Sequence, residues 1–131
     1  PEPSERLRLL LDLRWPGDAV RDPGPWLERL SRDADPAVRA GALRVAFECH
    51  VSFGAWATRL ADGDPDPTVR RELASAAIRL ADRLDVTPLL RALMAHKEDA
   101  RDPVIPQLVW IAYEKVLASR DRKGAGRGGK E

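Results

Sequence analysis

The stretch Asp35-Pro36-Ala37-Val38-Arg39 returns later in the chain as Asp66-Pro67-Thr68-Val69-Arg70. The two copies are separated by 31 residues (67 − 36 = 31). A third copy, Asp102-Pro103-Val104-Ile105-Pro106, follows 36 residues after the second (103 − 67 = 36). Self-similarity at a period of this size is typical of repeat proteins. The stretch therefore predicts three copies of one structural unit.

Each copy combines two residue types that begin a helix after a short loop. An aspartate that precedes a helix accepts hydrogen bonds from the unpaired N–H groups of the first turn. A proline fits the first helical position, because the N–H that it lacks would have no partner there. We therefore expect three helix starts, at Asp35 and Pro36, at Asp66 and Pro67, and at Asp102 and Pro103.

Apolar residues follow each start at helical spacing. They recur at i, i+4, i+7 and i+8, which places them on one face of an α-helix. The three stripes are Val38, Ala42, Val45, Ala46 and Cys49; Val69, Leu73, Ala76, Ala77 and Leu80; and Ile105, Val109, Ala112 and Val116. Shorter amphipathic segments precede the starts at residues 26–30, 53–61 and 86–94, and residues 4–13 predict a further helix.

The expected fold is therefore all-α. Antiparallel pairing of these helices predicts an α-solenoid of three helical hairpins plus an N-terminal helix, over residues 1–118. Residues 16–25 are rich in Pro, Gly and Asp and predict a loop. Residues 119–131 are rich in Arg, Lys and Gly, and we expect a disordered basic tail or linker there.

The composition is ordinary for a globular domain and excludes several functional classes. Hydrophobic residues make up 44% and charged residues 33% of the 131 residues, and a net charge of +1 does not indicate a polyanion-binding domain. Cys49 is the only cysteine, which excludes an intramolecular disulfide and a cysteine-based metal site within the chain. No apolar run approaches the ~20 residues of a membrane helix. The chain starts at Pro1 without methionine, and we expect a domain from a larger protein, with a processed chain as the alternative.

The Asp-Pro-x-Val-Arg starts at Asp35 and Asp66 resemble the HEAT repeat family in its short bacterial form. The third copy departs from the pattern, because Pro106 stands where Arg39 and Arg70 stand. The resemblance covers nearly the whole chain before the tail. It implies an armadillo-like stack of helical hairpins and says little about function, since function depends on sites rather than on folds.

A narrower resemblance lies in the third copy. The segment from Asp102 to Glu114 looks like a segment of large planctomycete-type proteins described as membrane-bound dehydrogenases or haem-binding proteins. In that family a propeller precedes the HEAT region and a cytochrome c domain follows it. The resemblance implies a non-catalytic spacer of a cell-envelope or periplasmic protein. The haem attachment motif Cys-x-x-Cys-His is absent, so no haem ligand is carried over and no cofactor is expected in this segment.

Arg39 and Arg70 recur after the capping aspartates, and we interpret them as a ladder of Arg–Asp contacts that joins successive turns. Binding of anions by this row is the alternative. Asp62, Asp64 and Asp66 alternate in the way that a calcium loop begins. The loop's later places, which need Gly and Glu, hold Pro67 and Leu73, so helix capping is the preferred interpretation.

The other chemistry-bearing residues give no complete site. His50 and His96 lie near predicted helix ends, where a contact with C-terminal carbonyls or solvent exposure explains them better than a metal. Cys49 falls on the first apolar stripe and predicts a small buried hydrophobe. A catalytic thiol beside His50 is the alternative, although adjacent helix positions point in different directions.

Candidate contact residues lie on the long helices. We expect an exposed interaction surface that comprises Arg44, Glu48, Ser75, Arg79 and Asp82. Trp110 and Tyr113 either pack against the preceding hairpin or form a docking surface, because the terminal repeats of a solenoid expose a face. The tail residues Arg120, Arg122, Lys123, Arg127 and Lys130 predict a solvated linker, with nucleic acid or anionic lipid as the alternative partner.

The sequence as a whole predicts a non-catalytic scaffold that contacts flanking domains of the same polypeptide or another protein, with no catalytic or metal site. The main alternative is a nucleic-acid-binding HEAT protein similar to small DNA glycosylases. Basic residues along the long helices are interrupted by acids, as Arg44 and Arg79 are by Glu48 and Asp82, which argues against a nucleic-acid groove. A chromophore-lyase-like enzyme, which short HEAT repeats also resemble, has no support from individual residues.

Overall fold

The computed structural model describes residues 24–48 and 54–128, and within these two ranges it is all-helical, with no strand. Its elements are α2 (Gly24–Leu30), α3 (Pro36–Glu48), α4 (Gly54–Gly63), α5 (Pro67–Leu80), α6 (Thr87–Met94), the 3-10 helix η1 (Lys97–Arg101) and α7 (Ile105–Gly128). The all-α class is confirmed for this part of the chain. The predicted helix at residues 4–13, Cys49, His50 and Lys130 lie outside the described residues.

The first two helix starts form as their sequence predicts. α3 begins at Pro36 and α5 at Pro67. The carboxylate of Asp35 accepts a hydrogen bond of 2.8 Å from the N–H of Ala37, and Asp66 accepts one of 2.8 Å from Thr68. Each bond satisfies a first-turn donor that has no partner within its own helix.

The third start is displaced. The carboxylate of Asp102 accepts hydrogen bonds from the N–H groups of Val104 (2.8 Å) and Ile105 (2.9 Å), and α7 begins at Ile105, two residues after Pro103. The proline in the first turn of this helix is instead Pro106. Proline is accommodated there because none of the first four N–H groups of a helix has an intrahelical partner. Asp102 thus keeps the capping role, while Pro103 falls outside the helix.

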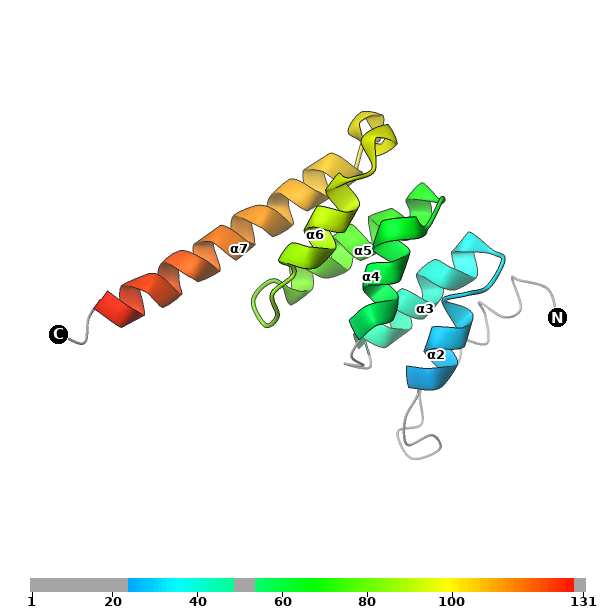
Figure 1. Cartoon of the computed structure of the whole chain (residues 1–131), viewed down its shortest axis with the longest axis horizontal. Coiled ribbons are helices and arrows are strands. Elements are labelled where there is room, and N and C mark those ends of the chain that lie inside the picture. The colour runs from blue at the N-terminus through cyan, green and yellow to red at the C-terminus, as the bar shows by residue number, and fades with distance from the viewer. Residues whose placement is uncertain (1–23, 49–53, 129–131) are drawn as a thin grey trace.

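From α3 onward, each α-helix packs against the α-helix two places further along the chain. The long helix α3 contacts α5, and α5 contacts α7. The short helices follow the same order, since α4 contacts α6. Within hairpins, α2 packs on α3, α4 on α5 and α6 on α7. Figure 1 shows α4 and α6 lying in front of α5.

The apolar stripes of the long helices face inward, as predicted. Val38 of α3, Leu73 of α5 and Val109 of α7 are all buried, and so are most of their stripe neighbours. The short helices contribute the remainder of one continuous core, chiefly Leu27, Trp56, Leu60, Leu89, Leu90 and Leu93. Burial of each large apolar side chain stabilises a fold by roughly 1.5–3 kcal/mol. The helices therefore share a single hydrophobic core.

Helix α7 is longer than the sequence predicts. It continues to Gly128, through residues that we expected to form an irregular tail from 119 onward. The segment Ser119 to Lys123 contains no helix breaker, and basic side chains near a helix C-terminus interact favourably with its dipole. The side chains of residues 120–126 are exposed, so the extension buries little. A domain boundary at residue 118 remains a prediction.

In residues 24–48 and 54–128, no helix combines the length and the apolar character that crossing a membrane requires.

Candidate interaction surface

Arg39 of α3 joins the first interhelical turn to the second. Its Nε donates to Asp64 Oδ2 at 2.7 Å and its Nη2 donates to Asp64 Oδ1 at 3.0 Å. The third nitrogen, Nη1, donates to the backbone carbonyls of Asp33 (2.8 Å) and Ala34 (3.1 Å). Hydrogen bonding to the Asp64 carboxylate raises the pKa of Arg39, against the effect of its partial burial. One guanidinium thus connects both turns.

Arg70 of α5 repeats this arrangement one turn further on. Its Nε and Nη2 donate to the two carboxylate oxygens of Asp99, both at 2.6 Å, and its Nη1 donates to the carbonyl of Asp64 at 2.7 Å. The Arg70 side chain is only 2% exposed. Hydrogen bonding to Asp99 raises the pKa of Arg70, against desolvation, which lowers it.

Together these two arginines form the predicted Arg–Asp ladder. The acids that receive them are Asp64 and Asp99, which precede the capping Asp66 and Asp102. The capping aspartates themselves are occupied by backbone N–H groups, and Asp102 also pairs with Arg71 at 2.7 Å. Since all three nitrogens of the Arg70 guanidinium already have acceptors within the chain, it is poorly placed to bind an external anion.

The polar candidates on the long helices form contacts within the chain. Arg44 of α3 pairs with Glu72 of α5 at 3.2 Å, and the guanidinium of Arg79 lies 5.2 Å from the centroid of the Phe47 ring. Asp82 lies 3.8 Å from Arg122 of α7. Ser75 is half-buried on α5, and the side chain of Glu48 lies outside the described set. Arg44, Arg79 and Asp82 therefore contact residues of the neighbouring long helix.

Trp110 and Tyr113 lie together on α7, with ring centroids 6.2 Å apart and planes inclined at 40°. Trp110 is 58% exposed, and Tyr113 is also exposed. Both rings border an opening between α6 and α7 rather than the core. Of the two interpretations, packing against the preceding hairpin therefore does not describe Trp110.

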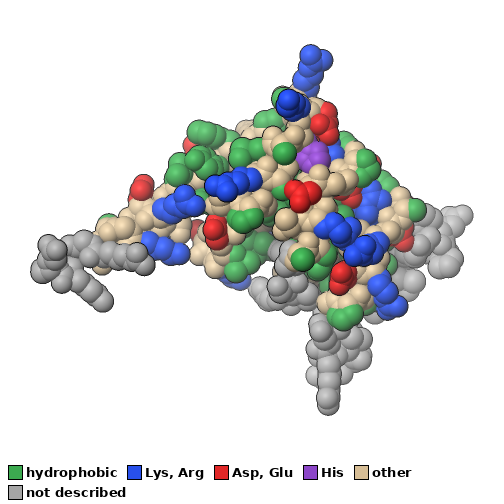
Figure 2. All heavy atoms as spheres, viewed as in Figure 1, with side chains coloured by type: hydrophobic (Ala, Val, Ile, Leu, Met, Phe, Trp, Pro, Cys, Tyr) green, Lys and Arg blue, Asp and Glu red, His purple; other side chains and the backbone are tan. Residues whose placement is uncertain are grey.

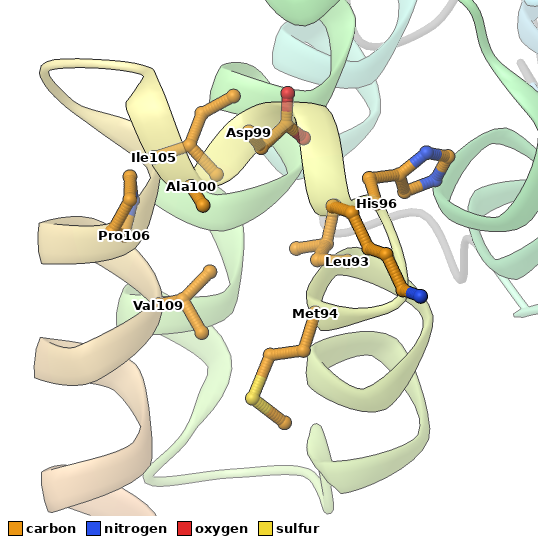
Figure 3. Close-up of a pocket in the computed structure, with 9 residues that line it drawn as sticks. Leu93, Met94, His96, Asp99, Ala100, Ile105, Pro106 and Val109 are labelled. Atoms are coloured by element: carbon orange, nitrogen blue, oxygen red, sulfur yellow. The ribbon is translucent and has the colours of Figure 1, made fainter.

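The opening between α6 and α7, called the α6–α7 groove below, consists of two adjoining cavities. The larger, of about 530 Å³, is lined mainly by Leu90, Met94, Pro106, Val109, Trp110 and Tyr113. The smaller, of about 350 Å³, shares Met94, Pro106 and Val109 and extends to His96, Lys97 and Asp99. Figure 3 shows the side chains of Met94 and Val109 directed toward each other from the two helices. The groove is thus mostly apolar, with charged groups at its edges.

Register across the three long helices shows why Trp110 and Tyr113 are exposed. When the helices are aligned on the three Asp-Pro turns, Leu43 and Ala74 occupy the place of Trp110, and Ala46 and Ala77 occupy the place of Tyr113. All four of these residues are buried. They lie on helices that are followed by another hairpin, whereas α7 is the last long helix described.

The short helices give the same result. A shift of 33 residues aligns the buried Trp56, Ala57 and Leu60 of α4 with the buried Leu89, Leu90 and Leu93 of α6 (89 − 56 = 33). The same shift places Met94 at the position of Ala61. Ala61 is fully buried, whereas Met94 is 57% exposed. The α6–α7 groove therefore lies on the face that a following hairpin would cover.

His96 and the aspartates near it have structural contacts. His96 Nε2 lies 2.5 Å from the carbonyl oxygen of Ala61 in the last turn of α4, rather than at the end of α6, which His96 follows in the sequence. Its Nδ1 lies 3.3 Å from Glu98 Oε1. Asp64 is buried beneath Arg39 rather than open to a cation. In the part of the chain that the structure describes, no three His, Cys, Asp or Glu residues converge as metal ligands would.

Comparisons with protein-family models, curated proteins and solved structures found no match for this chain. Of the groove residues, the sequence indicated Trp110 and Tyr113 but missed Met94, Leu90 and Arg91. A signal for two of these was present, since the 33-residue shift places Leu90 and Met94 where α4 carries Ala57 and Ala61, whereas the alignment does not distinguish Arg91.

Proposed function

We propose that the chain is a HEAT-type α-solenoid that acts as a non-catalytic protein-interaction scaffold. The observation that carries the proposal is the apolar face of the last hairpin, where Trp110 and Met94 are more than half exposed. Each occupies a position that is buried in the preceding repeat. A terminal repeat that faces water needs a polar outer surface. This face instead has the composition of a contact surface.

Two features support the solenoid part of the proposal. Helices two places apart pack together along the chain, in both the long and the short series. The Arg39–Asp64 and Arg70–Asp99 pairs connect equivalent places in consecutive turns. A stack in which each repeat contacts mainly its neighbours is the defining property of such arrays.

The residue types in the groove favour a protein partner. Exposed apolar patches with polar rims mark interaction sites on soluble domains. Trp, Tyr and Met are enriched at protein interfaces, and Trp and Tyr recur among the residues that dominate binding energy. Figure 2 shows basic and acidic side chains interspersed over the visible face, where a nucleic-acid groove would gather one sign.

The resemblance of the third copy to multidomain dehydrogenase or haem-binding proteins suggests which kind of protein contains this scaffold. We propose that the scaffold holds flanking domains of a larger dehydrogenase- or cytochrome-like polypeptide, or a separate protein. The segment from Asp102 to Glu114, which carries that resemblance, also contains Pro106, Val109, Trp110 and Tyr113 of the groove. The segment that carries the family resemblance thus also contributes residues to the contact surface.

Site-specific photo-crosslinking in cells that produce the protein tests the scaffold role. The crosslinker is placed in turn at the exposed Ile111 of α7, next to Trp110 in the sequence, at Ser75 on α5 and at Leu84 after α5. A discrete adduct with another protein or another domain supports the role, and absence of adducts from all three positions contradicts it. A mobility-shift assay with duplex DNA at low and high salt tests the nucleic-acid alternative, since binding through phosphates weakens steeply with salt.

A further inference from the structure

We propose that the α6–α7 groove binds one amphipathic α-helix whose apolar face is flanked by acidic residues. The inference rests on the scaffold role proposed above and names the chemistry of the partner at that surface. Three observations support it: the way in which neighbouring helices cover the equivalent positions, the departure of the third repeat from the ladder, and the unpaired cations at the groove.

Continuity with the existing helix interfaces identifies the partner as helical. Ala74 and Ala77 of α5 are fully buried, and α7 is the long helix that packs against α5. Trp110 and Tyr113 occupy the same register on α7 and are exposed. An element that covers them by the same geometry is a helix lying along α7 as α7 lies along α5.

The third repeat is not suited to another copy of the same hairpin. Arg39 and Arg70 each reach an acid in the following turn, but Pro106 stands at this position in α7 and has no side-chain donor. Trp110 replaces Leu43 and Ala74 with a much larger side chain, which prevents the close approach that Ala74 allows. A single helix can place its own side chains around the two rings and needs no ladder contact.

The charges at the groove select an acidic helix. Arg91 and Lys97 line the two cavities, and neither forms an ion pair with any residue in the described ranges. The one acid that lines the groove, Asp99, is already held by Arg70 at 2.6 Å. Elsewhere in the stack, Arg44 and Arg71 face an acid on the neighbouring element. A covering helix with Glu or Asp beside its apolar face would supply the missing partners.

Met94 and the two rings provide apolar contact of suitable shape. Met94 is unbranched and adapts to different side chains, as methionines in helix-binding grooves do. Leu90, Pro106 and Val109 also line this cavity of about 530 Å³ between α6 and α7. Anchors spaced at i, i+3, i+4 and i+7 on the incoming helix would enter such a groove.

A display selection against the full chain tests the inference. The library holds peptides of about 18 residues, long enough to form a marginal helix, with randomised positions on one face and at its edges. We expect enriched peptides to be apolar at i, i+3, i+4 and i+7 and acidic at the edges. Trp110→Ala should weaken their binding at least about tenfold, measured by fluorescence anisotropy.

Leu84→Ala is the matched control, because Leu84 is 57% exposed but borders a different cavity, beside Asp82 and Arg120. It should leave peptide affinity unchanged. Trp110→Phe provides a second groove variant with a smaller expected loss, should Trp110→Ala prove unstable. Arg91→Glu with Lys97→Glu should weaken acidic peptides and strengthen the same peptides with Lys in place of each Glu.

Several results would overturn the inference: a selection without helical binders, binders that ignore Trp110, or binders with basic edges. A Trp110-dependent dimer of the free chain in analytical ultracentrifugation would also overturn it, because a second copy would then occupy the groove. Binders that ignore Trp110 leave the crosslinking test untouched, so failure of this inference and failure of the scaffold role are distinguishable.

Discussion

Arg70 of α5 and Asp99 of η1 form a buried ion pair in which both guanidinium-to-carboxylate distances are 2.6 Å. The same guanidinium also donates to the carbonyl of Asp64 in the preceding turn, at 2.7 Å. Two consecutive turns are therefore attached to one side chain. Because Arg70 binds both turns, it links the ends of the last two described hairpins.

Removal of this side chain should destabilise the fold strongly. Arg70→Ala leaves Asp99 buried without its partner, and breaking a buried pair in this way costs about 3–5 kcal/mol. Arg44→Ala removes an exposed pair with Glu72 and should cost about 0–1 kcal/mol. Urea unfolding monitored by circular dichroism measures both free energies. Equal losses in the two variants would contradict the structural role of Arg70.

Asp102 should contribute a pH-dependent part of the stability. The Arg71 hydrogen bond, with the N–H groups of Ile105 and Val104, holds the pKa of Asp102 well below its usual range. A carboxylate with a depressed folded-state pKa stabilises the fold above its unfolded pKa of about 3.9, and the contribution is lost as the pH falls further.

Asp102→Asn tests this, because asparagine still caps α7 but carries no charge. We expect the difference in Tm between the natural chain and the variant to be largest near neutral pH. It should shrink steadily below about pH 4, as the unfolded chain takes up protons. Thermal melts at a series of pH values measure the difference. A difference that stays constant down to the lowest pH would show that the ion pair adds nothing.

Core substitutions should separate buried from exposed leucines. Leu73 of α5 is almost fully buried, so Leu73→Ala should cost about 2–5 kcal/mol through the lost contacts and the cavity left behind. Leu84→Ala at an exposed site should change the stability by no more than about 0.5 kcal/mol. Chemical denaturation of the two variants provides the comparison. A similar small effect at both sites would mean that the α5 stripe is not in the core.

The boundary at residue 118 can be tested by truncation. A chain that ends at Ala118 loses the exposed end of α7, including Arg120, which donates to Thr87 Oγ1 at 3.4 Å, and Arg122, which pairs with Asp82. Exposed contacts of this kind stabilise little. We expect the urea midpoint of the truncated chain to match that of the full chain. A clearly lower midpoint would place the end of the domain beyond residue 118.

The sequence predicted most of the helices because the deciding signals are local. Asp66 and Pro67 fix the start of α5 through one side-chain bond and one missing N–H, and both can be recognised in the sequence. The end of α7 was harder to predict from the sequence, because a segment rich in Arg, Lys and Gly is compatible with a solvated linker or with the last turns of a helix. The sequence did not identify Asp64 and Asp99 as the partners of the two ladder arginines, because that pairing depends on which turns lie side by side in the fold.

The groove was only half predictable for a similar reason. Trp110 and Tyr113 stand out in the sequence by size. Met94 stands out only when α4 and α6 are aligned, and its exposure depends on how the helices pack, since no helix in the described ranges covers it. Arg91 gains significance only from the structure, in which it lines the groove and forms no salt bridge within the described ranges.

Covalent footprinting of tryptophan tests most directly whether the last hairpin presents an uncovered apolar face. The free monomeric chain is exposed to hydroxyl radicals, and mass spectrometry measures the oxidation rates of Trp110, which is 58% exposed, and of Trp56, which is 7% exposed. We expect Trp110 to be oxidised several times faster than Trp56. Protection of Trp110 to the level of Trp56 would mean that the α6–α7 face is already covered, and would contradict a free docking surface there.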